Sequence, residues 1–273
     1  MTIYEERKRL KAGERVELEV RRYYQNEGCP DIVFARGLGG CAGREPLLDD
    51  LSEKYCVTTF SPRGAGESSG RLTVENCVQD ISLVVDDLSQ ERGRKVYGAF
   101  GHSMGGYAFA RILGERSAVE KAVLLCPLLS MYEQNPSLIS RPVKWATRSG
   151  SLPARFLDAC FDSYLPLDFL KVNGQGFRKS DLRLFVSSLY TSPHCDNKLL
   201  SPTRVLLTGG SVFHLPISNL DALKKEWESL GAKVSVWGDL DHLISGSPCS
   251  FGGEYYSKAK SSGIDKEIKE FFG

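Results

Sequence analysis

The sequence alternates short apolar runs with amphipathic helical patterns, and this alternation constrains its fold more than any other feature. Runs of about five apolar residues suit strands that are buried on both faces of a parallel sheet. Such runs occupy residues 32–35, 56–60, 96–100, 122–126, 204–207 and 234–237. Helical periodicity occupies residues 44–54, 73–91, 104–113 and 219–230, and a terminal segment that ends at Phe272. Preceded by a half-exposed strand at 15–24, this order predicts an α/β protein with a doubly wound, mostly parallel sheet.

The alternation is interrupted once, between residues 127 and 200. This segment is rich in aromatic residues: Trp145, Phe156, Phe161, Tyr164, Phe169, Phe177, Phe185 and Tyr190. A structureless loop of this length is implausible in a compact domain, so we expect a helical cap. The cap would be inserted into a single core made of residues 1–126 and 201–273. Its aromatic residues predict an apolar roof over a bound acyl or aryl group.

Composition argues against several function classes. The formal net charge is only +1, which gives no indication of a polyanionic partner. The basic cluster at residues 7–11 is interleaved with Glu5, Glu6 and Glu14, so we expect a solvated helix or turn rather than a nucleic-acid-binding patch. No apolar run approaches the roughly 18 residues of a membrane span, and the N-terminal segment lacks the apolar stretch of a signal peptide.

The cysteines and histidines predict neither a metal site nor a disulfide framework. The eight cysteines are scattered without a C-x-x-C pair, and Cys56, Cys77 and Cys126 lie inside apolar segments. Buried free thiols are typical of a reducing compartment, so we expect a cytoplasmic protein. The four histidines show no spacing typical of metal ligands, and we therefore expect no structural metal.

The segment most informative about chemistry is residues 95–106, where Gly101, Ser103 and Gly105 spell G-x-S-x-G between a strand and a helix. This pattern is typical of a nucleophile elbow, in which the serine occupies a strained turn at the end of a strand. The flanking glycines are needed because side chains there would collide with neighbouring elements. Ser103 is therefore the candidate nucleophile.

Together with two further segments, this motif resembles the α/β-hydrolase superfamily, particularly its capped esterase, lipase and thioesterase-like members. Residues 36–40, Arg-Gly-Leu-Gly-Gly, are similar to the family's H-G-x-x-G loop, with Arg36 in place of the usual histidine. Residues 63–68 are similar to its R-G-x-G-x-S segment. The resemblance covers about residues 30–126 and 201–245 and leaves the cap unmatched.

The resemblance implies a serine hydrolase that acts on a small acyl or aryl ester or thioester and needs no cofactor. Ser103 would form an acyl-enzyme, and His242, in a short loop after a late strand, would be the base. The backbone N–H groups of Leu38 and Met104 would hold the oxyanion. Because only backbone groups are used there, Arg36 need not disturb the hole. We interpret Arg36 as structural, with binding of an anionic substrate group as the alternative.

The catalytic acid is where the sequence departs from the family. Residues 209–216 resemble the family's G-x-x-D-x-x-x-P segment, but Val212 occupies the aspartate position. An apolar side chain cannot orient or stabilise an imidazolium. Asp239 could fold back toward His242 and supply the acid. Some family members place the acid after the strand that corresponds to residues 122–126, but here the first carboxylate after that strand is Glu133. The acid therefore stays unassigned.

Two other function classes compete for the same residues. Since the usual acid is missing, the fold could serve a binding protein or a non-hydrolytic enzyme such as an acyltransferase, a lyase or a cofactor-free oxygenase. Separately, residues 37–42 fit the dinucleotide fingerprint G-x-G-x-x-A, which would indicate a nucleotide-dependent oxidoreductase. That fingerprint needs an acidic residue about 20 positions later, and the strand at 56–60 ends without one, although Arg63 could suit a 2′-phosphate.

Overall fold

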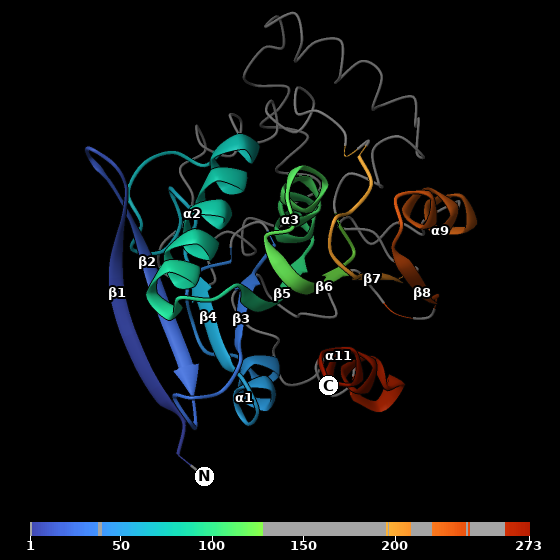
Figure 1. Ribbon diagram of the computed structural model, residues 1–273, viewed down its shortest axis with the longest axis horizontal. Helices are drawn as coiled ribbons and strands as arrows, with labels where there is room; N and C mark the ends of the chain where they lie inside the picture. Colours follow the sequence, from blue (N-terminus) through green and yellow to red (C-terminus); the bar gives the residue numbers. More distant parts are fainter. Residues whose placement is uncertain are drawn as a thin grey trace, which may run out of the picture.

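A computed structural model describes residues 2–37, 40–127, 195, 197–208, 220–238, 240 and 260–273 of the chain. Within these residues, one sheet of eight strands has the order β1-β2-β4-β3-β5-β6-β7-β8 (Figure 1). The strands are β1 (Tyr4–Gly13), β2 (Val16–Tyr24), β3 (Asp31–Ala35), β4 (Cys56–Phe60), β5 (Val96–His102), β6 (Val119–Leu125), β7 (Thr203–Thr208) and β8 (Lys233–Trp237).

The sheet is parallel from β4 to β8 and antiparallel at one edge. β1 and β2 form an antiparallel hairpin, and β2 pairs antiparallel with β4. The pairs β3–β4, β3–β5, β5–β6, β6–β7 and β7–β8 are all parallel. The predicted doubly wound, mostly parallel sheet is therefore confirmed, and β5 lies near its centre.

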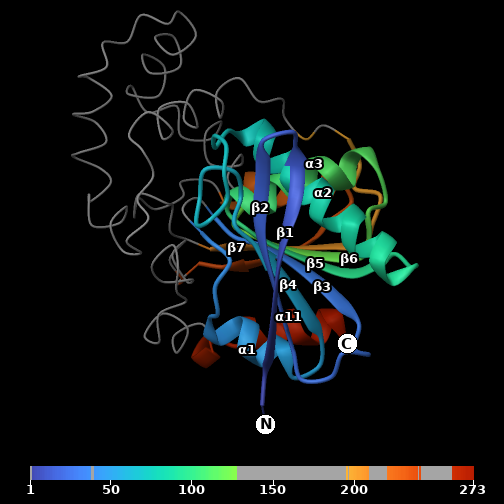
Figure 2. The same cartoon turned by 90° about the vertical axis from the view of Figure 1, so that its left-hand side faces the viewer.

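Helices cover both faces of the sheet, as Figures 1 and 2 show. The described helices are α1 (Pro46–Ser52), α2 (Val74–Arg92), α3 (Met104–Glu115), α9 (Leu220–Ser229) and α11 (Ile264–Phe272). Apolar residues of α2, α3 and α9 join one buried cluster, and those of α1 and α11 join a second. The sheet separates the two clusters, which is the layer arrangement expected for a doubly wound fold.

Local sequence signals explain why α2 begins and ends where it does. The Thr73 side chain accepts a hydrogen bond of 3.0 Å from the Asn76 N–H and caps the first turn. Gly93 adopts the left-handed conformation that ends many helices. Between these ends the stripe containing Cys77, Ile81, Val84 and Leu88 is buried. The predicted helix at 73–91 is thus confirmed.

The interpretation of residues 7–11 as a helix or turn is wrong, because they form the middle of β1. The strand is exposed along nearly its whole length, as the charges suggested, but its hydrogen bonds come from pairing with β2. Side chains also hold it: the Arg21 Nη1 lies 3.3 Å from the Glu5 Oε1, and the Lys8 Nζ lies 2.9 Å from the Glu91 Oε2 of α2. Pairing and cross-strand charges override a pattern that has no apolar face of its own.

Most of the segment predicted to form a helical cap, residues 127–200, lies outside the described residues. The proposed boundaries between cap and core therefore stay predictions. In the part of the chain that the structure describes, no helix has the length and apolar character that crossing a membrane requires.

Candidate active site

Ser103 lies at the carboxyl end of β5, between its two parallel neighbours β3 and β6. Its N–H donates a hydrogen bond of 2.8 Å to the carbonyl of Leu125 in β6, and its carbonyl accepts one of 3.0 Å from the Tyr107 N–H in α3. The serine thus joins the last residue of a central strand to the first turn of a helix. In open α/β sheets, ligands bind at this edge, beyond the carboxyl ends of the strands.

The backbone of Ser103 is strained. Its φ is 54° and its ψ is −114°, a conformation that residues with a Cβ rarely adopt. Among the described residues other than glycine, only Ser103 and Cys126 have a positive φ. Strain of this kind costs about 1–3 kcal/mol and persists only where the surroundings impose it. The turn at Ser103 therefore has the geometry that the G-x-S-x-G pattern predicts.

Both glycines of the motif sit where a side chain would collide with backbone. A Cβ on Gly101 would lie 2.7 Å from the Cα of Gly106, and one on Gly105 would lie 2.3 Å from the carbonyl oxygen of Ala35. These contacts bring the start of α3 directly against β5 and the end of β3. The tight turn consequently depends on glycine at both positions.

The loop after β3 lies against the same turn. The Gly105 N–H donates to the carbonyl of Arg36 at 3.1 Å. A Cβ added to Gly37 would lie 3.1 Å from the Cβ and 3.5 Å from the Oγ of Ser103. The described part of the predicted oxyanion loop is therefore in contact with Ser103.

Met104, the other predicted oxyanion donor, is the first residue of α3. Its side chain is buried in the core, so the backbone N–H is the group available for chemistry at this position. The first amides of an α-helix have no acceptor within the helix, and the helix dipole favours negative charge at that end. The start of α3 beside Ser103 therefore suits a developing oxyanion.

Comparison with known proteins agrees with this geometry. The family described as serine aminopeptidase, S33, matches residues 31–163, which include β3, β5 and the turn at Ser103. An esterase from Pyrococcus furiosus superposes with a TM-score of 0.61 at 15% identity, covering 99% of this chain and 94% of that one. The chain has the α/β-hydrolase fold. The fold that the resemblance to the α/β-hydrolase superfamily implied is thereby confirmed.

Two further α/β-hydrolase structures are similar over nearly the whole chain. Epoxide hydrolases from metagenomes of hot environments give a TM-score of 0.64 at 16% identity, covering 96% of this chain and 97% of that one. The enol-lactonase from Burkholderia xenovorans LB400 gives a TM-score of 0.60 at 18% identity, covering 96% and 98%. At these identities the similarity establishes the fold, while activity must be argued from the site.

Arg36, which stands where α/β-hydrolases of this type have histidine, is buried and turned toward protein groups. Its Nη1 lies 3.2 Å from the Glu45 Oε2, and its Nη2 donates to the carbonyl of Gly43. The guanidinium also lies over the Phe34 ring, 5.6 Å from the ring centroid. These contacts favour the structural interpretation of Arg36 over binding of an anionic substrate group.

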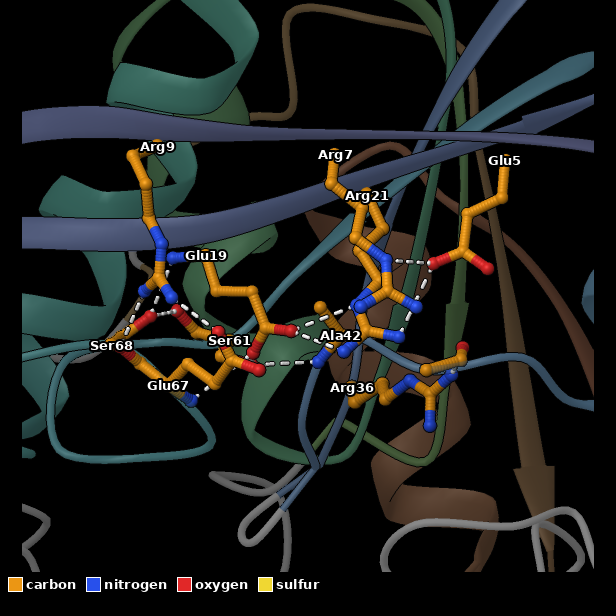
Figure 3. A network of polar contacts seen from close by, with 11 residues as sticks. Glu5, Arg7, Arg9, Glu19, Arg21, Arg36, Ala42, Ser61, Glu67 and Ser68 are labelled. Atoms are coloured by element: carbon orange, nitrogen blue, oxygen red, sulfur yellow. Dashed lines mark hydrogen bonds and ion pairs between the residues drawn. The ribbon is translucent and has the colours of Figure 1, made fainter.

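A buried polar network lies beside the loop that follows β3, and the sequence analysis did not predict it (Figure 3). The carboxylate of Glu19, in β2, accepts hydrogen bonds from the Ser61 hydroxyl at 2.7 Å, the Glu67 N–H at 3.1 Å and the Arg21 Nε at 2.8 Å. The Ser68 hydroxyl donates to the Ser61 carbonyl at 2.6 Å and accepts from the Glu19 N–H at 2.8 Å. The R-G-x-G-x-S similarity, which ends at Ser68, was the signal that could have pointed to it.

The geometry gives no support to the dinucleotide fingerprint. A helix should open directly at the glycines to bind pyrophosphate, but α1 begins only at Pro46, after the loop that contains Ala42. Arg63, which was considered as a partner for a 2′-phosphate, is paired with Asp80. The Arg63 Nε lies 2.6 Å from the Asp80 Oδ1, and the Arg63 backbone N–H donates a hydrogen bond of 2.8 Å to the Asp80 Oδ2.

Some of the predicted site residues cannot be placed from the described part of the chain. Leu38, His242, Val212 and Asp239 lie outside the described residues, so their roles stay predictions. Within the described residues, no group of three or more His, Cys, Asp or Glu side chains is arranged to hold a metal ion. At the carboxyl ends of β6 and β7, the buried Cys126 Sγ lies 3.0 Å from the Thr208 Oγ1, which links the two strands next to the turn at Ser103.

Proposed function

We propose that the protein is a serine hydrolase that cleaves a carboxylic ester or thioester, with Ser103 as nucleophile and His242 as base. The observation that carries this proposal is the strained turn at Ser103, held by glycine contacts between β5 and α3. Strained backbone concentrates at functional sites, and a serine with φ of 54° needs such a reason. The substrate is a small molecule, consistent with the hydrolase family that matches the chain.

In this mechanism the Ser103 hydroxyl attacks the carbonyl carbon while His242 removes its proton. The N–H groups of Leu38 and Met104 hold the oxyanion of the tetrahedral intermediate. His242 then protonates the leaving alcohol or thiol, and an acyl-enzyme remains on Ser103. Water activated by His242 releases the acid. No step in this sequence requires a metal or an organic cofactor.

The names of the neighbours support an ester substrate, since two of them are an esterase and an enol-lactonase. We further propose that the acyl or aryl group of the substrate lies under a cap formed by residues 127–200, whose aromatic content suits an apolar roof. An experimental structure with Ser103 open to bulk water, far from that segment, would refute the roof.

We also propose that the protein is cytoplasmic, because of the state of its cysteines. Cys56 and Cys77 are buried and form no disulfide, and neither does Cys29. Burial raises the pKa of the Cys77 thiol, so it stays protonated and unreactive at neutral pH. Such thiols fit a reducing compartment.

A second candidate function follows from Val212, which stands at the family's usual acid position. Without an acid the fold would serve a non-hydrolytic reaction, such as acyl transfer, a lyase reaction or cofactor-free oxygenation, or would bind a ligand without turnover. An acyltransferase would still form an acyl-enzyme on Ser103, so Ser103 would react with a fluorophosphonate probe. In a lyase, an oxygenase or a binding protein, Ser103 would not react with that probe.

The test is labelling with a fluorophosphonate probe combined with hydrolysis of short aryl esters. We expect the probe to modify Ser103, and Ser103→Ala to abolish both labelling and turnover. The matched control is Ser229→Ala, which removes an exposed serine hydroxyl on α9 and leaves both readouts unchanged. Unchanged turnover in Ser103→Ala would end the serine hydrolase proposal.

A further inference from the structure

Residues 36–45, which connect β3 to α1, begin against the turn at Ser103 and are rich in glycine. Because a glycine-rich backbone is flexible, contacts with neighbouring residues must fix its position. Residues 37, 39 and 40 are all glycine, and glycine restricts the backbone least of all residues. At its start the Arg36 carbonyl accepts from the Gly105 N–H, and the Arg36 guanidinium binds Gly43 and Glu45. Between these two ends, Ala42 is held by a different residue.

That residue is Ser61, the first residue after β4. Its Oγ accepts a hydrogen bond of 2.8 Å from the Ala42 N–H, and its side chain is fully buried. Figure 3 shows this contact between the loop after β3 and the loop after β4. Ser61 is thus attached to the loop on which the proposed oxyanion donor Leu38 is carried.

Glu19 fixes the direction of the Ser61 hydroxyl. An ionised carboxylate can only accept hydrogen bonds, so the single proton of the Ser61 hydroxyl points to the Glu19 Oε2 at 2.7 Å. The oxygen lone pairs then face the Ala42 N–H. Burial alone would raise the pKa of Glu19, but hydrogen bonds from Ser61, the Glu67 N–H and Arg21 outweigh it and hold this pKa below its ordinary value. The carboxylate therefore stays charged at neutral pH.

We propose that Ser61, oriented by Glu19, is a positioning residue for the oxyanion hole. It acts through the Ala42 N–H on residues 36–42 and does not touch the substrate. This inference rests on the proposed function, since it presumes that the loop supplies an oxyanion donor. Removing one such donor lowers kcat by about 10²–10³, and misplacing a catalytic group by about 1 Å costs on the order of 10².

The test compares two serines of the same network. Ser61→Ala removes the acceptor of the Ala42 N–H, whereas Ser68→Ala removes a hydroxyl that bonds Ser61 and Glu19. For Ser61→Ala we expect kcat for an aryl ester to fall about ten-fold or more with KM within about two-fold, as positional effects on transition-state binding require. An aryl trifluoromethyl ketone, whose adduct with Ser103 places an oxyanion in the hole, should lose affinity by the same factor. Ser68→Ala should keep the wild-type kcat and the wild-type affinity for the ketone. The kcat of each variant is expressed per active site, and the active sites are counted by titration with fluorophosphonate.

Two results would overturn the inference: unchanged kcat and ketone affinity in Ser61→Ala, or an equal loss in Ser68→Ala. Should Ser61→Ala fail to fold, Ser61→Cys keeps the side-chain shape and weakens the acceptor, and an unchanged kcat in that variant would also overturn it. The proposed function fails separately. If Ser103 is labelled and Ser103→Ala is inactive while Ser61→Ala behaves as wild type, only the positioning role of Ser61 is refuted.

Discussion

Gly105 and Ala35 are so close that a Cβ on Gly105 would lie 2.3 Å from the Ala35 carbonyl oxygen. We therefore predict that Gly105→Ala destabilises the protein by at least ~2 kcal/mol, because the start of α3 must move away from β3. Urea unfolding measures the change. Gly13→Ala is the control, since its nearest neighbour would be 3.9 Å away, and it should change stability by less than about 0.5 kcal/mol. Equal effects of the two substitutions would contradict the prediction.

The strain at Ser103 predicts an order of stability among inactive variants. Glycine at position 103 relieves a φ of 54° that alanine retains. The relief is about 1–3 kcal/mol, and the extra freedom of glycine in the unfolded chain offsets about 0.5–1 kcal/mol. Ser103→Gly should therefore be about 1 kcal/mol more stable than Ser103→Ala, by urea unfolding. A Ser103→Ala variant as stable as Ser103→Gly would limit the strain to the roughly 0.5–1 kcal/mol that glycine loses through the unfolded chain and would contradict the expected difference.

The missing acid gives a prediction on activity. If His242 works without an anionic partner, Val212→Asp should raise esterase turnover by about ten-fold or more, since losing the acid of a serine protease costs about 10⁴. Val212→Asn has nearly the same shape without the charge and should give no gain. If Asp239 already serves as the acid, Val212→Asp should instead lower activity by placing two negative charges together, and Asp239→Asn should cripple turnover.

The lowered pKa of Glu19 predicts a pH-dependent contribution to stability. Its ordinary value is 4.5, and the value in the folded protein is lower. An acid whose pKa is depressed on folding stabilises the protein above its unfolded pKa, and this stabilisation is lost as the pH falls through the folded value. The difference in unfolding free energy between wild type and Glu19→Gln should thus be largest at neutral pH and shrink as the pH falls below 4.5.

Glu14→Gln, on the exposed turn between β1 and β2, is the control for that measurement. It removes an exposed carboxylate and should change the unfolding free energy by less than about 0.5 kcal/mol. A difference between wild type and Glu19→Gln that grows toward acid pH would reverse the sign that the hydrogen bonds of Glu19 predict.

The elements that could be predicted from the sequence are those whose signals are local. The strand at 56–60 coincides with β4, and the helix at 73–91 is recognisable because Thr73 caps it and one apolar stripe runs along it. The turn at Ser103 could equally be predicted from the sequence, because an apolar run, the spaced glycines and a helical pattern follow one another directly. Local chemistry sufficed there because the same few residues make both the turn and its strain.

Signals that depend on distant partners were missed. β1 carries charges on both faces and has no apolar stripe, so only its pairing with β2 makes it a strand. Glu19 lies in a strand predicted to be half-exposed, where a glutamate suggests contact with water. It is buried because Ser61, 42 positions later, and Arg21 satisfy its carboxylate. A short window around residue 19 contains Arg21 but not Ser61, so it does not show that the carboxylate is satisfied.

The neighbouring strands β6 and β7 are separated by 77 residues of sequence, from 126 to 202. At a synthesis rate of about 5–20 residues per second, the open edge of β6 waits roughly 4–15 s for its partner on the ribosome. During that interval an apolar strand edge can pair with other nascent chains. The 77 residues between β6 and β7 therefore give aggregation time to compete with folding of this sheet. Expression at lower temperature, or with chaperones that bind exposed strands, should raise the soluble yield.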